Sequence, residues 1–131
     1  MKYGITIENK RIIVTPEIKG INDFRKFNFI LDTGASKSII DEIAVKRLGY
    51  ELHRLKVGDR LSTAGGGVRS KIVELPELTL FGAKMVNFEV NVIKLPYQIL
   101  YYADGLIGMD FLLQFQAVRF DFVQKFIEIE G

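Results

Sequence analysis

Short strand-like segments separated by turn residues dominate the chain, and this pattern limits its fold more than any other feature. Short alternating or β-branched runs recur along the whole length, and Gly, Asn and Asp interrupt them. About eight strands against one or two short helices are typical of a mainly β domain, closed or sandwich-like. The expected strands cover residues 3–8, 11–18, 27–31, 59–64, 68–75, 77–81, 85–93, 117–122 and 126–130.

Two stretches carry helical signals instead. Residues 38–49 begin with Ser38 as the expected N-cap, have Asp41 three residues later and end at Gly49. Acidic residues come early in this stretch and basic residues come late, which suits the helix dipole. A shorter turn of helix is expected within residues 109–115.

Composition narrows the possible functions. The chain has 131 residues, 48% of them hydrophobic, which is enough for a core, and no linker is visible, so we expect one domain over residues 1–131. It contains no Cys and a single His, His53, which excludes thiolate zinc sites, multi-His metal sites and a Cys nucleophile. A net charge of +2 from scattered Lys and Arg does not indicate a nucleic-acid partner.

Nothing in the sequence suggests a membrane partner or export. No apolar run approaches the roughly 18 residues that a membrane-spanning helix needs. The first residues, Met-Lys-Tyr-Gly-Ile-Thr-Ile-Glu, lack the apolar stretch of a signal peptide. We therefore expect a cytoplasmic location.

One apolar strand delivers an acid to a tight turn. The run Phe-Asn-Phe-Ile-Leu at 27–31 leads into Asp32, Thr33 and Gly34. This order places a carboxylate at the end of a strand, where Gly34 lets the backbone bend sharply. The small Ala35 and Ser36 that follow allow another backbone or a substrate to come close. By itself the motif also fits a plain connection in which Asp32 caps a turn.

Two further elements follow in order. Three consecutive glycines, Gly65 to Gly67, lie between strand-like segments and predict a β-hairpin with a flexible tip. Farther on, Leu106 and Ile107 precede Gly108 at the start of the short helix. Each element also has an ordinary interpretation, as a β-turn or as a buried strand with a close backbone approach.

Taken together, these three elements resemble the retropepsin-like aspartic proteases, in particular the single-domain forms of bacteria and archaea. The resemblance runs from about Tyr3 to Glu130. It implies a closed β-barrel with one lobe per chain and one or two short helices. It also implies an aspartic endopeptidase that hydrolyses extended peptides with two carboxylates, which needs no metal or other cofactor. Because the chain has one Asp-Thr-Gly, the two carboxylates would come from Asp32 of each subunit of a homodimer.

The resemblance also assigns roles to residues. A catalytic role is implied for Asp32, and Thr33 and Gly34 would support it, Thr33 by a hydrogen bond across the dimer and Gly34 by an amide to the carboxylate. The glycine-rich hairpin would close over the substrate as a flap. The residues expected to contact substrate are Ala35, Ser36, Ala64, Gly65, Gly66, Gly67, Val68, Leu106, Ile107 and Gly108.

Several alternatives stay open. A catalytically silent module of the same fold, which binds peptides or only dimerises, would carry the same motifs. A β-barrel that binds nucleic acid would need aromatic residues interleaved with a basic stripe, which the balanced charges do not provide. We interpret Asp110 as the acid of a helix start, Asp104 as a loop end and His53 as exposed. The C-terminal hairpin at 117–130 is either an edge of the monomer or a dimer contact.

Overall fold

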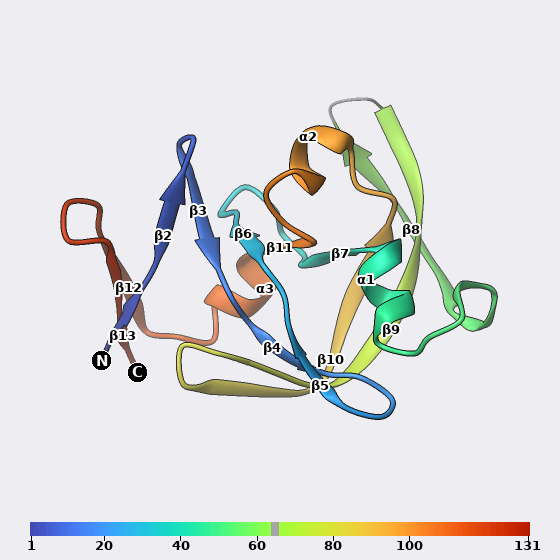
Figure 1. Ribbon diagram of the computed structural model, residues 1–131, viewed down its shortest axis with the longest axis horizontal. Coiled ribbons are helices and arrows are strands. Elements are labelled where there is room, and N and C mark those ends of the chain that lie inside the picture. The colour runs from blue at the N-terminus through green and yellow to red at the C-terminus, as the bar shows by residue number, and fades with distance from the viewer. Residues whose placement is uncertain (64–65) are drawn as a thin grey trace.

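The computed structural model describes residues 1–63 and 66–131 and consists of two β-sheets with a few short helices (Figure 1). The small sheet contains β1 (Lys2–Gly4), β12 (Ala117–Asp121) and β13 (Phe126–Glu130). The large sheet contains β2 (Thr6–Glu8), β3 (Arg11–Val14), β4 (Glu17–Lys19), β5 (Phe24–Lys26), β6 (Phe29–Leu31), β7 (Ile39–Asp41), β8 (Lys56–Thr63), β9 (Gly66–Leu80), β10 (Ala83–Ile93) and β11 (Gly105–Ile107).

The order of the large sheet brings distant segments together at its centre. It runs β2-β3-β6-β11-β7-β10-β9-β4-β5, and β8 pairs with β9 outside this path. Strand β11 lies between β6, to which it is parallel, and β7, to which it is antiparallel. The mainly β class is confirmed. The pairings of the described residues form an open path, so the closed barrel that the resemblance implied is not among them.

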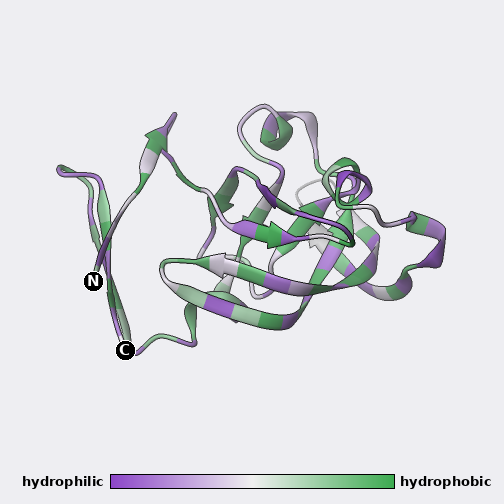
Figure 2. Ribbon diagram, turned by 60° about the horizontal axis from the view of Figure 1, so that its bottom comes forward, coloured by the Kyte–Doolittle hydropathy of each residue, from purple (hydrophilic) through white to green (hydrophobic). Residues whose placement is uncertain are grey.

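The longest feature is the antiparallel pair of β9 and β10. Leu80 and Ala83 are opposite partners, which leaves a two-residue turn of Phe81 and Gly82. Both turn residues have positive φ, 53° and 71°, as the favoured tight hairpin turn requires. Along these strands apolar and polar residues alternate in Figure 2, because one face meets the core and the other meets solvent.

The core sits beneath the centre of the large sheet. Phe29 of β6, Ile107 of β11 and Phe111 have no exposed surface. Burying each of these side chains stabilises the fold by about 1.5–3 kcal/mol. Packed apolar side chains therefore hold the strands next to the Asp-Thr-Gly turn in place.

The first predicted helix begins later than the sequence suggested. Helix α1 covers Glu42–Arg47, and its N-cap is Asp41, whose Oδ2 accepts a hydrogen bond from the Ile43 amide at 3.0 Å. The prediction of Ser38 as N-cap was wrong. Residues Ile39–Asp41 form β7 instead, because they pair with β10 on one side and with β11 on the other, and Ile40 is completely buried there. The capping signals were real but belonged to Asp41.

The other helices are single turns. They are the 3₁₀ helix η1 (Leu52–Arg54), α2 (Tyr97–Leu100) and α3 (Met109–Leu112). Helix α3 lies inside the predicted stretch 109–115, whereas α2 and the short exposed strand β5 were not expected. None of the helices in the described parts of the chain has the length and apolar character needed to cross a membrane.

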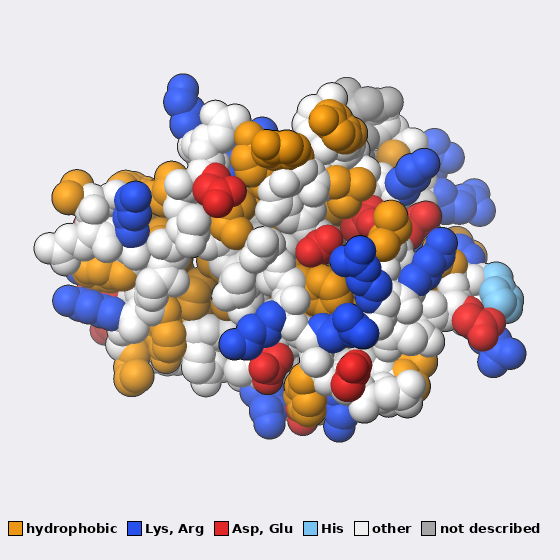
Figure 3. Space-filling view, viewed as in Figure 1, with side chains coloured by type: hydrophobic (Ala, Val, Ile, Leu, Met, Phe, Trp, Pro, Cys, Tyr) orange, Lys and Arg blue, Asp and Glu red, His pale blue; other side chains and the backbone are white. Residues whose placement is uncertain are grey.

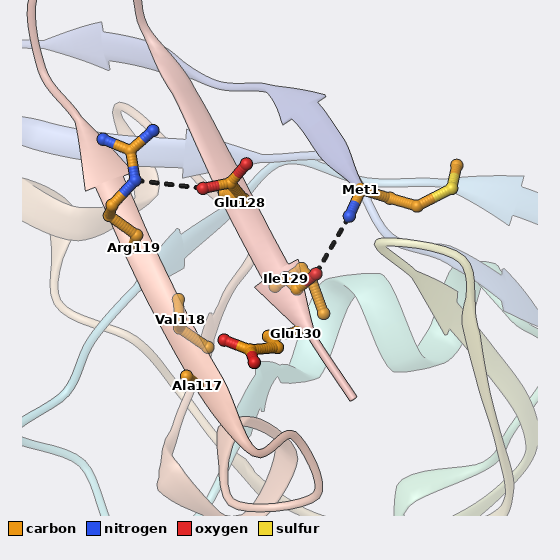
Figure 4. A pocket seen from close by; sticks show the side chains of 7 residues that line it. All are labelled: Met1, Ala117, Val118, Arg119, Glu128, Ile129 and Glu130. Carbon is orange, nitrogen blue, oxygen red and sulfur yellow. Dashed lines mark hydrogen bonds and ion pairs between the residues drawn. The ribbon is translucent and has the colours of Figure 1, made fainter.

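The small sheet joins the two chain ends and stands at one side of the molecule (Figures 1 and 2). Strand β13 lies in the middle, β1 and β12 flank it, and the N-terminal ammonium of Met1 donates to the Ile129 carbonyl at 3.0 Å. Arg119 of β12 lies opposite Glu128 of β13, and its Nε donates to the Glu128 Oε1 at 3.0 Å (Figure 4). These groups line an open hollow of about 500 Å³. The predicted C-terminal hairpin is confirmed.

Candidate active site

Asp32 lies immediately after β6, where the central strands of the large sheet end. Its amide donates to the carbonyl of Ile107 in the neighbouring β11 at 2.9 Å, which ties the start of the turn to the sheet. The Gly34 amide donates to Oδ1 of the Asp32 carboxylate at 2.9 Å, and the Ala35 amide donates to the Asp32 carbonyl at 3.2 Å. The structure gives Oδ2 no hydrogen bond to any residue that it describes, so this oxygen is available to a water molecule or a substrate.

A second loop braces the Asp-Thr-Gly turn from the side. The amides of Met109 and Asp110 donate to the carbonyls of Ala35 and Ser36 at 2.8 and 3.1 Å. A Cβ atom on Gly108 would lie 2.6 Å from the Ala35 carbonyl oxygen, closer than packed atoms come. Gly108 is therefore the residue that lets the two loops touch, which supports the close backbone approach expected there.

A buried serine and a carboxylate join the same loops a second time. Ser38 is 1% exposed, and its amide and hydroxyl donate to Oδ2 and Oδ1 of Asp110 at 2.9 and 2.7 Å. The Ser38 hydroxyl also accepts from the Gly108 amide at 3.0 Å. The interpretation of Asp110 as a helix-start acid missed this contact, because its partner lies 72 residues away in sequence. A contact between residues so far apart leaves no pattern in the neighbouring sequence from which it could be predicted.

The structure places the other expected site residues in different settings. Thr33 and Ser36 are exposed beside Asp32, and Ala35 is half-buried. Leu106 is half-buried against the small apolar cluster of Ile13, Ile30 and Ala103. The side chain of Ile107 is completely buried in the main core, so only its backbone carbonyl reaches the Asp32 turn.

The glycine-rich hairpin consists of β8 and the first part of β9. In its ladder Leu61 lies opposite Val68, and Gly67 and Gly66 follow toward the tip. Ala64 and Gly65, for which substrate contacts were also expected, lie outside the described residues. Leu61 shares a hollow of about 230 Å³ with Gly34, Ala35, Ser36, Lys37, Ile39 and Asn91. The hairpin therefore lies beside the Asp32 turn at Leu61, close to its tip.

Two other titratable groups, Asp104 and His53, lie away from this turn. Asp104 precedes β11, at the opposite end of that strand from Gly108; burial raises the pKa of its carboxyl and so does the neighbouring Asp41, whereas Arg47 lowers it. His53 is exposed, as expected, and its Nε2 lies 3.3 Å from the Glu51 carboxylate. Within the residues that the structure describes, no group of three acidic or histidine side chains could hold a metal ion.

The fold and the motif match known proteins. The chain resembles a retropepsin-like aspartic protease from Rickettsia conorii, with a TM-score of 0.75 and 21% identity over 98% of this chain and 89% of that one. It also resembles the EIAV protease solved with the inhibitor HBY-793, with a TM-score of 0.63 and 24% identity over 81% of this chain and 88% of that one. No curated protein sequence matches significantly.

The family assignment rests on the sequence itself. The model of the aspartyl protease family matches residues 14–111, most of the chain, from β3 through the Asp-Thr-Gly turn to α3. The two solved structures show the same fold over most of each chain. The expectation of a retropepsin-like aspartic peptidase is confirmed, and the chain belongs to the aspartyl protease family.

Proposed function

We propose that the chain is an aspartic endopeptidase that cuts extended peptides as a homodimer, with one Asp32 from each copy. The observation that carries the proposal is the Asp32 turn, in which Gly34 holds one carboxylate oxygen and leaves the other available. Aspartic peptidases need two carboxylates about 3 Å apart that share one proton. The chain contains one Asp-Thr-Gly, and a two-fold axis beside Asp32 would supply the second carboxylate.

The chemistry would follow from this shared proton. The ionised Asp32 accepts a proton from a water molecule, which attacks the carbonyl carbon of the scissile bond. The protonated Asp32 of the other copy donates its proton to the carbonyl oxygen, and a tetrahedral intermediate forms. Collapse of this intermediate breaks the C–N bond: the nitrogen leaves with the proton that one Asp32 took from water, and a hydroxyl of the intermediate returns a proton to the other Asp32 as the new carboxyl group forms. The exposed Thr33 beside Asp32 is free to bond to the partner copy and hold both turns in place.

The hairpin of β8 and β9 would cover the substrate. An extended peptide between the hairpin and the Asp32 turn would be bound by main-chain hydrogen bonds, and side-chain pockets would supply selectivity. Gly66 and Gly67 lack side chains, so their backbone is able to approach such a peptide closely.

The small sheet supports a dimer contact. Strand β12 pairs only with β13, so its other edge is open among the described residues. Open strand edges readily pair with another chain, and a second copy would continue the sheet across the two-fold axis. Leu113, Phe122 and Val123, which flank this strand, are 72%, 62% and 90% exposed. Their burial in a dimer would add apolar contact.

Digestion of a mixed peptide library at weakly acidic pH tests the function. We expect the wild-type chain to cleave peptides and Asp32→Asn to lose at least about 100-fold of this activity, because a general acid–base group is removed. The variant should unfold at the same temperature. Activity should also collapse at alkaline pH, where both carboxylates ionise. Equal cleavage by both proteins would contradict the proposal, and no cleavage by either would favour a silent peptide-binding module.

A further inference from the structure

We propose that the hollow beside the Asp32 turn selects substrates that carry an acidic side chain near the scissile bond, and that Lys37 recognises it. The inference rests on the proposed function, because the hollow selects a substrate only if peptides bind between the Asp32 turn and the hairpin. It concerns specificity and not the chemical step.

The lining of the hollow fits one carboxylate-bearing side chain. Its apolar part comes from Ala35 and Ile39 beside the turn and from Leu61 of the hairpin. Lys37 is its one charged residue, and Ser36 and Asn91 add polar groups. A volume of about 230 Å³ admits a single side chain. The methylene groups of Glu would pack on the apolar wall, and its carboxylate would reach the ammonium group.

Asn91 provides a second polar group that the fold does not use fully. It is only 4% exposed although it lines the hollow. The hydroxyl of Ser70 donates to the Asp59 carbonyl at 2.6 Å and lies 3.5 Å from the Asn91 side chain, so Asn91 is held only weakly. No fully buried side-chain nitrogen or oxygen atom of the described residues lacks a hydrogen-bond partner, so Asn91 is not an unsatisfied buried group. Its only side-chain contact among them is the long one to Ser70, which leaves the amide able to form a further hydrogen bond. A substrate carboxylate would accept a hydrogen bond from it.

Lys37 is not committed elsewhere in the structure. It is exposed and makes no ion pair within 4 Å with any of the described side chains. Two acidic residues, Glu89 and Asp110, line a second hollow to which Lys37 also contributes. Of these, Asp110 is already bound by the amide and hydroxyl of Ser38. The negative charge of the Asp32 dyad repels a substrate carboxylate, which therefore favours the part of the hollow next to Lys37.

The hairpin above the hollow adds positive charge. Its segment 56–71 contains four basic residues and one acidic residue in a chain whose net charge is +2. Arg60 and Arg69 lie directly opposite each other in the ladder, although like charges in this position are destabilising. Figure 3 shows Lys and Arg side chains gathered at the right-hand edge, where β8 and β9 run in Figure 1. This field favours the approach of acidic peptides.

Matched synthetic peptides test the inference. A peptide cleaved by the wild-type chain is remade with Glu, Gln or Lys at each of the three positions on either side of the cut, and kcat/KM is measured near pH 6. We expect Glu to exceed the isosteric Gln by roughly fivefold at one position, as for a partly exposed ion pair, and the ratio to shrink at high salt. In Lys37→Met the Glu and Gln peptides should be cleaved equally well. In Lys37→Glu the Lys peptide should become the preferred substrate. Lys46→Met, which removes an exposed cation from α1, should leave the ratio of Glu to Gln unchanged.

Each outcome decides the inference separately from the proposed function. Equal rates for Glu and Gln at every position, or a Glu preference that survives in Lys37→Glu, would overturn the role of Lys37 while cleavage itself supports the protease. If no peptide is cleaved, the same Glu, Gln and Lys versions of fluorescent library peptides are bound to Asp32→Asn and followed by anisotropy. A Glu preference that Lys37→Glu reverses would support the pocket without the protease, and no preference would overturn it.

Discussion

The two sides of the hollow beside Asp32 are built in opposite ways. On one side, two backbone hydrogen bonds join the 32–38 loop to the 108–110 loop, and the buried Ser38 and the Asp110 carboxylate join them again. On the other side, the end of the β8–β9 hairpin is held by its own ladder, and its described residues Gly66 to Arg69 are exposed or half-exposed.

This difference separates two requirements of catalysis. A carboxylate dyad works only if both acids are held in a fixed geometry before the substrate binds. A segment that covers a peptide must instead move aside for binding and release. The buried contact between Ser38 and Asp110 lies beside the Asp32 turn, whereas residues Gly66 to Arg69 at the end of the hairpin are exposed or half-exposed. Damage to the first side should therefore affect stability and activity together, and damage to the second should affect activity alone.

Among the variants that test this comparison, the largest effect is expected from Asp110→Ala. The substitution leaves the Ser38 amide and hydroxyl without their acceptors in a buried position, which should lower the free energy of unfolding by about 1–3 kcal/mol. We expect kcat/KM to fall more than about tenfold, because the Asp32 turn loses part of its support. Thermal unfolding and peptide cleavage measure the two changes. Asp110→Asn keeps one acceptor oxygen and should lose less of both. Unchanged stability and activity in Asp110→Ala would show that the second loop does not hold the turn.

A smaller and purely functional effect is expected from Gly67→Ala. A Cβ atom there would meet only the Arg60 side chain, at 3.4 Å, so the free energy of unfolding should change by less than about 0.5 kcal/mol. Activity should fall several-fold, because the added methyl group hinders the close approach of the hairpin backbone to a peptide. Steady-state kinetics and a denaturant titration measure both quantities. A loss of stability with full activity would mean that the end of the hairpin supports the fold and does not approach the substrate, contrary to our account.

The smallest effect is expected at Asp104, which lies at the far end of β11 from the site. Because burial raises the pKa of its carboxyl above 3.8, the folded chain binds this proton more tightly than the unfolded chain does. The free energy of unfolding therefore falls as the pH rises from the ordinary carboxyl pKa to the raised pKa of folded Asp104. Asp104→Asn has no carboxyl proton to lose, so this fall should not occur in the variant. We expect the variant to melt roughly 1–3 °C higher at pH 7 and equally at pH 3, with unchanged activity. A lower melting temperature at pH 7 would show that the carboxylate stabilises this end of the sheet.

Much of the fold could be predicted because its signals are local. The alternation at 85–93 and 126–130 marks strands whose two faces meet different surroundings, and β10 and β13 lie there. Residues 39–41 were assigned to a helix because the signals on either side of them were helical. Their strand character comes only from β10 and β11, which lie far away in sequence.

The site divides in the same way. The Asp32 turn and Gly108 carry local constraints, a sharp bend and a close approach, that favour particular residue types in a recognisable order. The pairing of Ser38 with Asp110 has no such mark, since any small polar residue and any acid would look the same in sequence. Lys37 and Asn91 become candidates only when the fold brings them to one hollow.

The central claim, a dyad shared by two copies of Asp32, is tested most directly by mixing subunits. Wild-type and Asp32→Asn chains are incubated together at constant total concentration until subunits exchange, and peptide cleavage is measured against the wild-type fraction. Because a mixed dimer keeps only one carboxylate, we expect activity to follow the square of this fraction, about one quarter of full activity at equal proportions. A straight line, with half of the activity at equal proportions, would mean that each chain acts alone and would contradict the shared dyad.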